Sequence, residues 1–423
     1  MTWTFWAALV VVIGTVWALI KRYETRLVLL TSGLIMALLA VEPMAAFKQF
    51  DKSMTSASLI IAICSSMGFA GVMSLTKCDL HLVSLLTKPL RTLGVLLLPC
   101  CMIVTGFISV AISSFAGLCA AVGPTIVTLM VRAGFRPAIA AAAVAGATVP
   151  GFLSPGTSHN VFVSKLAEMP IMDYIYATAP RTIGLLFVLT AFMTVLCFLY
   201  GDYKRGGFDV KGLDAGGKGP ELPENPNLLF AFAPILPVVV LLCFSIWMPE
   251  LKLSVATAML IGMLYCIVVT RSNPQEIIKK FFDGMGRGYG NIIGIIIAAG
   301  VFSAGLASCG VIEVFVDYLR HSSEVAKLGA AIGPYVLGVM TGSGDAATFA
   351  FNEAVTPHAA QFGMTIPDLG YLASIAGAFG RASSPLAGGM IVISGIAMVS
   401  PLEVVKLTAP VMTCGLVVLY VIS

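Results

Sequence analysis

Charged residues are scarce in this chain, and that scarcity restricts its possible folds more than any other feature. Asp, Glu, Lys and Arg make up 11% of the 423 residues, whereas hydrophobic residues make up 58%. Soluble domains carry about 25% charged residues, so this chain cannot cover itself with a water-exposed surface. The composition excludes a soluble enzyme, a nucleic-acid-binding protein, a disordered chain and a disulfide scaffold. We therefore predict an all-α polytopic membrane protein.

Ten apolar segments are long enough to cross a bilayer, which takes about 20 residues per helix. Two of them, about 137–166 and 367–399, are interrupted by Pro and Gly. The uninterrupted segments are 3–20, 26–41, 57–75, 174–200, 228–247, 252–270, 289–310 and 402–423. Two further stretches, about 93–133 and 325–362, are too long for one crossing and are broken midway by small polar residues. We interpret each as a re-entrant hairpin, whose turn must be buried in protein or line a wet cavity.

The basic residues orient these segments. In this arrangement, most of the 25 Lys and Arg residues fall in loops on one face of the membrane. Cytoplasmic loops carry such an excess of positive charge, so we predict that both termini are periplasmic. A few lie on the opposite face, and only Arg181 and Arg381 belong to neither face, because they lie within apolar segments.

The two halves of the chain repeat one another at an offset of about 230 residues. For example, Thr178-Ala179-Pro180 matches Thr408-Ala409-Pro410, and Ser154-Pro155 matches Ser384-Pro385. The halves are 1–200 and 228–423, each with five membrane helices and one hairpin, and the Gly/Pro-rich stretch 201–227 is a cytoplasmic linker. An odd number of crossings inverts the second half, which is a common plan of secondary transporters.

Each half also has an amphipathic segment before its hairpin, at Asp79–Leu90 and Glu313–His321. These segments are interpreted either as surface helices that brace a moving part or as ordinary connecting helices.

Small polar residues gather at the two helix breaks and the two hairpin tips. Half-helix N-termini at membrane depth attract anions, and unwound carbonyls bind cations. We predict a substrate-binding set made of Ser113, Ser114, Thr157, Ser158, His159, Asn160, Ser343, Gly344, Arg381, Ser383 and Ser384.

Arg381 is the most informative of these residues. An Arg at the centre of a bilayer costs about 2.5–3.5 kcal/mol on insertion scales. Its fork of donors suits a carboxylate, so we expect it to bind an anion; a structural ion pair is the alternative. Whether Arg181 reaches the same site, or extends to the membrane surface, stays open.

Two carboxylates are candidates for coupling or charge relay. Asp345, at the second hairpin tip, could neutralise Arg381, ligate Na⁺ or carry a proton, and Glu353 is a secondary candidate. His159 could donate to a carboxylate or titrate. The cysteines and histidines show no metal-ligand spacing, so we expect no metal and no cofactor, with Na⁺ or H⁺ as possible coupling ions.

Three stretches, Thr341–Glu353, Arg381–Pro385 and Pro155–Asn160, resemble the DcuC family of anaerobic C4-dicarboxylate carriers. The wider ion-transporter superfamily, including the divalent anion/sodium symporters, shares the paired hairpins and inverted repeats. The resemblance implies exchange, uptake or efflux of succinate, fumarate or malate across a bacterial inner membrane. It also implies a homodimer in membrane lipid that works by an elevator mechanism, and no nucleic-acid partner.

Three other functions fit parts of the same pattern. A cation/proton antiporter of the same superfamily would also use Asp345, and a carrier of another small organic anion would use the same site. Gly342-Ser343-Gly344-Asp345 also matches the G-x-G-D signature of intramembrane aspartyl proteases. That chemistry needs a second carboxylate at close range, and no second Asp lies deep in any predicted span.

Overall fold

The computed structural model of the chain is all-helical, as the composition predicts. It describes residues 3–21, 23–87, 94–112, 114–204, 223–248, 253–312, 314 and 323–423. Within those ranges there is no strand, only an isolated bridge between Phe135 and Tyr203. The first half contains α1 (Trp3–Ile20), α2 (Thr25–Leu39), α3 (Pro43–Met54), α4 (Ala57–Thr76), α5 (Cys78–Thr87), η2 (Gly94–Leu96), α6 (Leu97–Ala111), α7 (Phe115–Arg132), α8 (Pro137–Gly146), η3 (Val149–Leu153), α9 (Ser158–Leu166) and α10 (Ile171–Leu199).

The second half contains α11 (Leu228–Phe232), α12 (Leu236–Trp247), α13 (Val255–Thr270), α14 (Pro274–Gly288), η4 (Tyr289–Ile293), α15 (Gly294–Ser308), α17 (Ser323–Thr341), α18 (Gly344–Ala354), η5 (Thr356–Phe362), α19 (Ile366–Ala382), α20 (Gly388–Ile396) and α21 (Pro401–Ile422). The expected amphipathic segment Glu313–His321 and most of the linker 201–227 lie outside the described residues.

Seven helical segments in the described part of the chain are long and apolar enough to cross a membrane. On α1, Trp3, Trp6 and Val10 are each more than half exposed, as suits a helix that faces lipid. The seven segments are Trp3–Ile20, Ala57–Thr76, Phe115–Arg132, Pro137–Leu166, Ile171–Leu199, Pro274–Ser308 and Pro401–Ile422.

The helix expected at 289–310 starts earlier than its apolar run suggests. α14, η4 and α15 together form a helical segment over Pro274–Ser308. α14 exposes its charges and packs a glycine-bearing face against α4. A Cβ at Gly284 would lie 2.4 Å from the Met67 carbonyl oxygen, so only glycine permits this approach. The charges on the outer face of α14 interrupt the apolar pattern, so the predicted helix began only at residue 289.

The first interrupted segment is folded around a buried asparagine. α8 and α9 are separated by the short 3₁₀ turn η3 and by residues 154–157. Asn160 Nδ2 donates to the Phe152 carbonyl at 2.6 Å and to the Ser154 carbonyl at 3.0 Å. These bonds satisfy carbonyls that a continuous helix would have bonded itself.

The second interrupted segment has the same form. α19 ends at Ala382 and α20 begins at Gly388. Inside the joint, the Leu386 N–H donates to Ser384 Oγ at 3.2 Å. Gly342, at the end of α17, lies against this joint with φ of +74°, and a Cβ there would be 2.7 Å from the Leu386 carbonyl carbon. The turn between α17 and α18 therefore depends on glycine.

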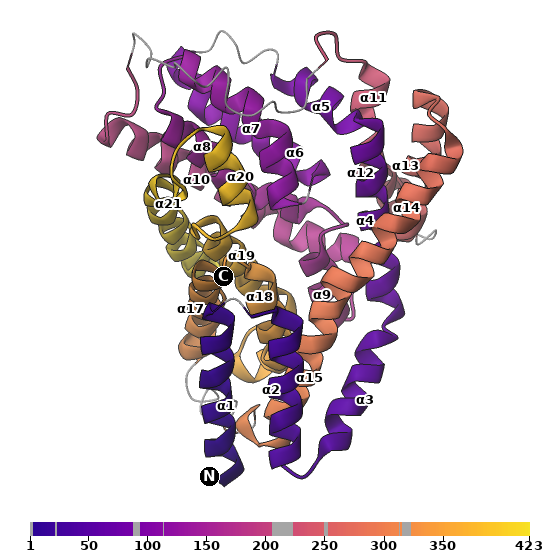
Figure 1. Cartoon of the computed structure of the whole chain (residues 1–423), viewed down its shortest axis with the longest axis vertical. Coiled ribbons are helices and arrows are strands. Elements are labelled where there is room, and N and C mark those ends of the chain that lie inside the picture. The colour runs from indigo at the N-terminus through magenta and orange to yellow at the C-terminus, as the bar shows by residue number, and fades with distance from the viewer. Residues whose placement is uncertain are drawn as a thin grey trace.

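The helices pack into two units, each built from both halves of the chain. One hydrophobic core joins α6–α8 and α10 to α17 and α19–α21, and we call these helices the large unit. A second core joins α1, α2 and α4 to α12–α15, and with α3, which packs on α2 and α15, we call these helices the small unit. In Figure 1 the large unit lies mostly at the upper left, and the small unit extends from the upper right to the foot of the view, where α1 and α2 lie.

Two helices lie between the units. α9 packs against α4 on one side and α19 on the other, and α18 packs against both α15 and α19. Val161 and Phe162 of α9, and Phe349 and Ala354 of α18, are buried in the core of the small unit. The boundary between the units therefore runs along α9 and α18.

Candidate functional site

A cavity of about 450 Å³ lies at the boundary between the two units. Ligand pockets typically measure about 300–1,000 Å³, so a small organic molecule fits. Residues of α4 such as Ser66 and Met67 line one side, and the two interrupted segments line the other. Asp79 of α5 and Pro234, between α11 and α12, also line it, and these elements lie at the top of Figure 1.

Four helix N-termini lie at this cavity. The lining includes the first residues or caps of α7, α9, α18 and α20: Ser114 and Phe115, Thr157 and Ser158, Ser343, and Gly388 and Gly389. Of these four helices, only α7 has a side-chain cap, in which the Gly117 N–H donates to Ser114 Oγ at 3.2 Å. The first N–H groups of a helix have no intrahelical partner, and each N-terminus presents about half a positive charge.

Three charged or titratable side chains line the cavity among these N-termini. Arg381 Nη1 and His159 Nε2 each lie 3.5 Å from the same atom, Asp345 Oδ1. Asp345 stays 35% exposed and Arg381 23% exposed, whereas His159 is 9% exposed. Arg381 and Asp345 thus keep surface on which a ligand can bind.

Two aromatic rings hold these groups. The Arg381 guanidinium lies 5.3 Å from the centroid of the Phe115 ring, within cation–π range. His159 stacks on Phe349, with centroids 4.7 Å apart and an interplanar angle of 11°. A Cβ on Gly389 would be 2.5 Å from the Phe115 ring, so this glycine lets the ring pack against the start of α20.

The predicted site residues divide into two groups. Arg381, His159, Asp345, Ser114, Ser343, Thr157 and Ser158 line the cavity. Asn160, Ser383 and Ser384 are buried, and Gly344 packs against α19, where a Cβ would lie 2.3 Å from the Gly377 carbonyl oxygen. None of these four lines the cavity; they shape the broken segments instead. Ser113 lies outside the described residues.

Glu353 also lies away from the cavity. It accepts a hydrogen bond from Gln49 Nε2 of α3 at 3.1 Å. Nearby, Lys165 Nζ of α9 donates to Ser56 Oγ, the cap of α4, at 2.5 Å. Both bonds join the helices of the boundary to the small unit.

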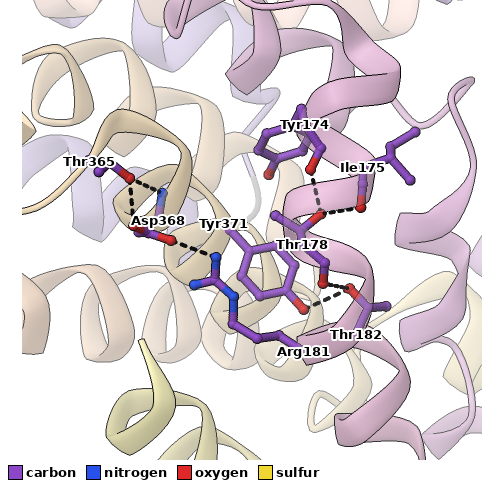
Figure 2. A network of polar contacts seen from close by, with 8 residues as sticks. All are labelled: Tyr174, Ile175, Thr178, Arg181, Thr182, Thr365, Asp368 and Tyr371. Carbon is purple, nitrogen blue, oxygen red and sulfur yellow. Dashed lines mark hydrogen bonds and ion pairs between the residues drawn. The ribbon is translucent and has the colours of Figure 1, made fainter.

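Arg181 is engaged elsewhere in the structure. Figure 2 shows it reaching from α10 to Asp368 of α19, with Nη2 and Oδ1 2.5 Å apart. The guanidinium lies over the Tyr371 ring, whose hydroxyl is 2.8 Å from Thr182 Oγ1. Arg181 does not line the cavity. Its contacts join α10 to α19 within the large unit.

Several cavity residues escaped the sequence analysis. Ser66, Ser109 and Thr148 line the cavity but were not predicted. Ser66 and Ser109 lie within apolar helices, and Thr148 directly precedes the first break. Phe115 was not predicted either, because a Phe in an apolar run carries no signal of its own. Within the described ranges, no three His, Cys, Asp or Glu side chains are grouped so that they could hold a metal ion.

Comparisons with known proteins agree on a transporter. Residues 24–422 match the family DcuC, described as C4-dicarboxylate anaerobic carrier. An uncharacterized transporter of Haemophilus influenzae is 42% identical over 264 residues, which cover 61% of this chain and 95% of that protein. The anaerobic C4-dicarboxylate transporter DcuC of Escherichia coli O6:H1 is 27% identical over 454 aligned residues, covering 97% of this chain and 94% of that one.

The fold is also similar to that of a solved structure. The YdaH transporter of Alcanivorax borkumensis superposes with a TM-score of 0.61, at 14% sequence identity. The match covers 89% of this chain and 86% of that one. At this identity the similarity shows a shared fold alone.

Proposed function

Because the chain belongs to the DcuC family of C4-dicarboxylate anaerobic carriers, we propose that it carries succinate, fumarate and malate by exchange, uptake or efflux. It is a multi-pass membrane transporter and not an enzyme. The protease alternative also lacks its chemistry, since in the described residues the ionic partners of Asp345 are Arg381 and His159 and not a second carboxylate.

The observation that carries this proposal is the convergence of Arg381 and four helix N-termini on one cavity. A C4-dicarboxylate brings two negative charges. Four N-termini together present about two positive charges, and Arg381 adds a third; Asp345 partly balances it, and Asp79 also lines the cavity. Bidentate binding by Arg381 would hold one carboxylate, and the unbonded N–H groups of α9, α18 and α20 would receive the other.

The two packing units support an elevator mechanism. In our proposal the halves form an inverted repeat, α6–α7 and α17–α18 are re-entrant hairpins, and the large unit moves with α9 and α18 against the small unit. The cavity lies at their boundary and extends toward α5 and α11, which the charge distribution assigns to the cytoplasmic side. The conformation described here would then be open to the cytoplasm. A bacterial inner-membrane location, periplasmic termini and a homodimer belong to the same proposal.

A cation/proton antiporter is the second candidate, because Asp345 is a carboxylate in the cavity. Counterflow separates the two functions. Fumarate loaded inside proteoliposomes should accelerate entry of labelled succinate only if the carrier binds dicarboxylates. Uptake measured with and without a sodium gradient at fixed pH tests Na⁺ as the coupling ion, and uptake with and without a pH gradient at fixed sodium tests H⁺.

Removal of the Arg381 guanidinium tests the site. We expect Arg381→Ala to reduce succinate uptake at least a hundredfold, because truncation of one partner of a buried charged contact costs several kcal/mol. Arg271→Gln, at an exposed position after α13, is the matched control and should transport normally. Uptake by Arg381→Ala at the wild-type rate, with equal protein per vesicle, would overturn the assignment.

A further inference from the structure

One carboxylate of the chain itself makes the contacts that a substrate carboxylate would make. Asp345 Oδ1 lies 3.5 Å from Arg381 Nη1 and 3.5 Å from His159 Nε2. All three side chains line the cavity. Asp345 and a bound dicarboxylate would therefore compete for the same guanidinium.

This competition matters for the half of the cycle in which no substrate is carried. A transporter that performs net transport must change sides once loaded and once unloaded, whereas an exchanger is loaded in both directions. An unloaded carrier takes Arg381 through the membrane without a substrate carboxylate. An unpaired charge in a low-dielectric setting is costly, and removal of its partner leaves that cost uncompensated.

The position of Asp345 suits it to this half of the cycle. It lies in the first turn of α18, and Arg381 lies in the last turn of α19. α18 packs against α19, so the two charges would move as a pair. When a substrate carboxylate binds Arg381, Asp345 can still pair with His159. His159 stays in place because it stacks on Phe349.

On the basis of the proposed function, we infer that Asp345 is an internal counter-anion that replaces the substrate at Arg381 and so lets the unloaded carrier return. The chain then performs net transport as well as exchange, and Asp345 sets the balance between the two. Neutralising Asp345 should slow the unloaded return far more than exchange, since the substrate itself neutralises Arg381 in both directions of exchange.

The test measures both activities on the same proteoliposomes, at fixed pH and with the membrane potential clamped to zero. Exchange is the release of labelled succinate into buffer that contains unlabelled succinate, and net transport is its release into substrate-free buffer. We expect Asp345→Asn to lower the ratio of net release to exchange at least tenfold relative to wild type. Asp345→Glu should recover net release, and Glu276→Gln, an exposed carboxylate of α14, should change neither rate.

Three results would overturn the inference. Asp345→Asn could slow both activities equally while eluting from size exclusion as wild type does, or could leave both unchanged. The wild type could also exchange without any net release. In each case dicarboxylate transport by the wild type still stands, so the inference fails alone; if the wild type moves no dicarboxylate at all, the proposed function itself fails.

Discussion

The chemistry of individual side chains in the cavity depends on apolar neighbours as much as on charge. Arg381 is oriented by the Phe115 ring, which comes from the other half of the chain. His159 is oriented in the same way by Phe349, again from the opposite half. Each half therefore supplies the ring that holds a polar group of the other, and correct assembly of the halves is a condition for the binding geometry.

A substitution at Phe115 tests this support. Phe115→Leu keeps a bulky apolar side chain and removes the π face, so the KM for succinate should rise about fivefold, equivalent to about 1 kcal/mol of lost cation–π interaction. The maximal rate should change little. Phe115→Tyr keeps the face and should restore the wild-type KM. An equal loss of rate in both variants, with unchanged KM, would indicate a role in packing alone.

Arg381, Asp345 and His159 of the cavity could be predicted from the sequence, whereas the rings that support Arg381 and His159 could not. Arg381 and Asp345 stand out because charges inside apolar segments are rare. Phe115 is one of 24 phenylalanines, and only its position distinguishes it. Asn160, Ser383 and Ser384 were predicted to bind substrate, but a polar side chain at a helix break can equally turn inward. Asn160 and Ser384 bond freed backbone groups, and Ser383 Oγ accepts from the Tyr335 hydroxyl.

At the scale of elements, close helix packing brings the N-terminus of α18 to the cavity. A Cβ on Gly344 would lie 2.3 Å from the Gly377 carbonyl oxygen. α18 and α19 are therefore closer together than a residue larger than glycine at position 344 would allow. The same part of the fold offers a contrast, because a Cβ on Gly333 of α17 would meet no atom within 4 Å.

These two glycines form a matched pair for mutation. Gly344→Ala should force α18 away from α19 and destabilise the protein by about 1–3 kcal/mol, as overpacking commonly does. Gly333→Ala should be neutral or stabilising by about 0.5–1 kcal/mol, because alanine suits a helix better than glycine. Thermal unfolding in detergent, followed together with succinate uptake, measures both effects. Equal stability of the two variants would contradict the packing argument.

The helices themselves were largely predictable, since long apolar runs leave few alternatives in a membrane. α3 was not predicted, because its polar residues interrupt the apolar pattern; they lie on an amphipathic helix that packs against α2 and α15. Such helices bury one face only, and a search for continuous hydrophobicity misses them.

At the scale of the whole molecule, polar contacts between the units lie at a distance from the cavity. The bond from Gln49 to Glu353 joins α3 of the small unit to α18 at 3.1 Å. If the units slide past one another, this contact must break in every cycle. By contrast, Arg181 and Asp368 join two helices within the large unit and should stay together throughout.

Cross-linking distinguishes these two contacts. Cysteines at Gln49 and Glu353, joined by a short bifunctional thiol reagent, should stop transport, and cleavage of the reagent should restore it. Cysteines at Arg181 and Asp368 should be joined without a further loss of rate. Cys414 is exposed, so both pairs are made with Cys414→Ser. Full activity after joining Gln49 to Glu353 would contradict movement at this boundary.

The four helix N-termini at the cavity have a consequence for how such a site can diversify. Their positive potential comes from peptide groups, which every amino acid carries, so no single substitution removes it. Mutations at Thr157, Ser158 or Ser343 can reshape the walls of the cavity while its attraction for anions is inherited unchanged. Descendants of this chain could thus acquire new organic acids as cargo in small steps, without passing through a form that binds none.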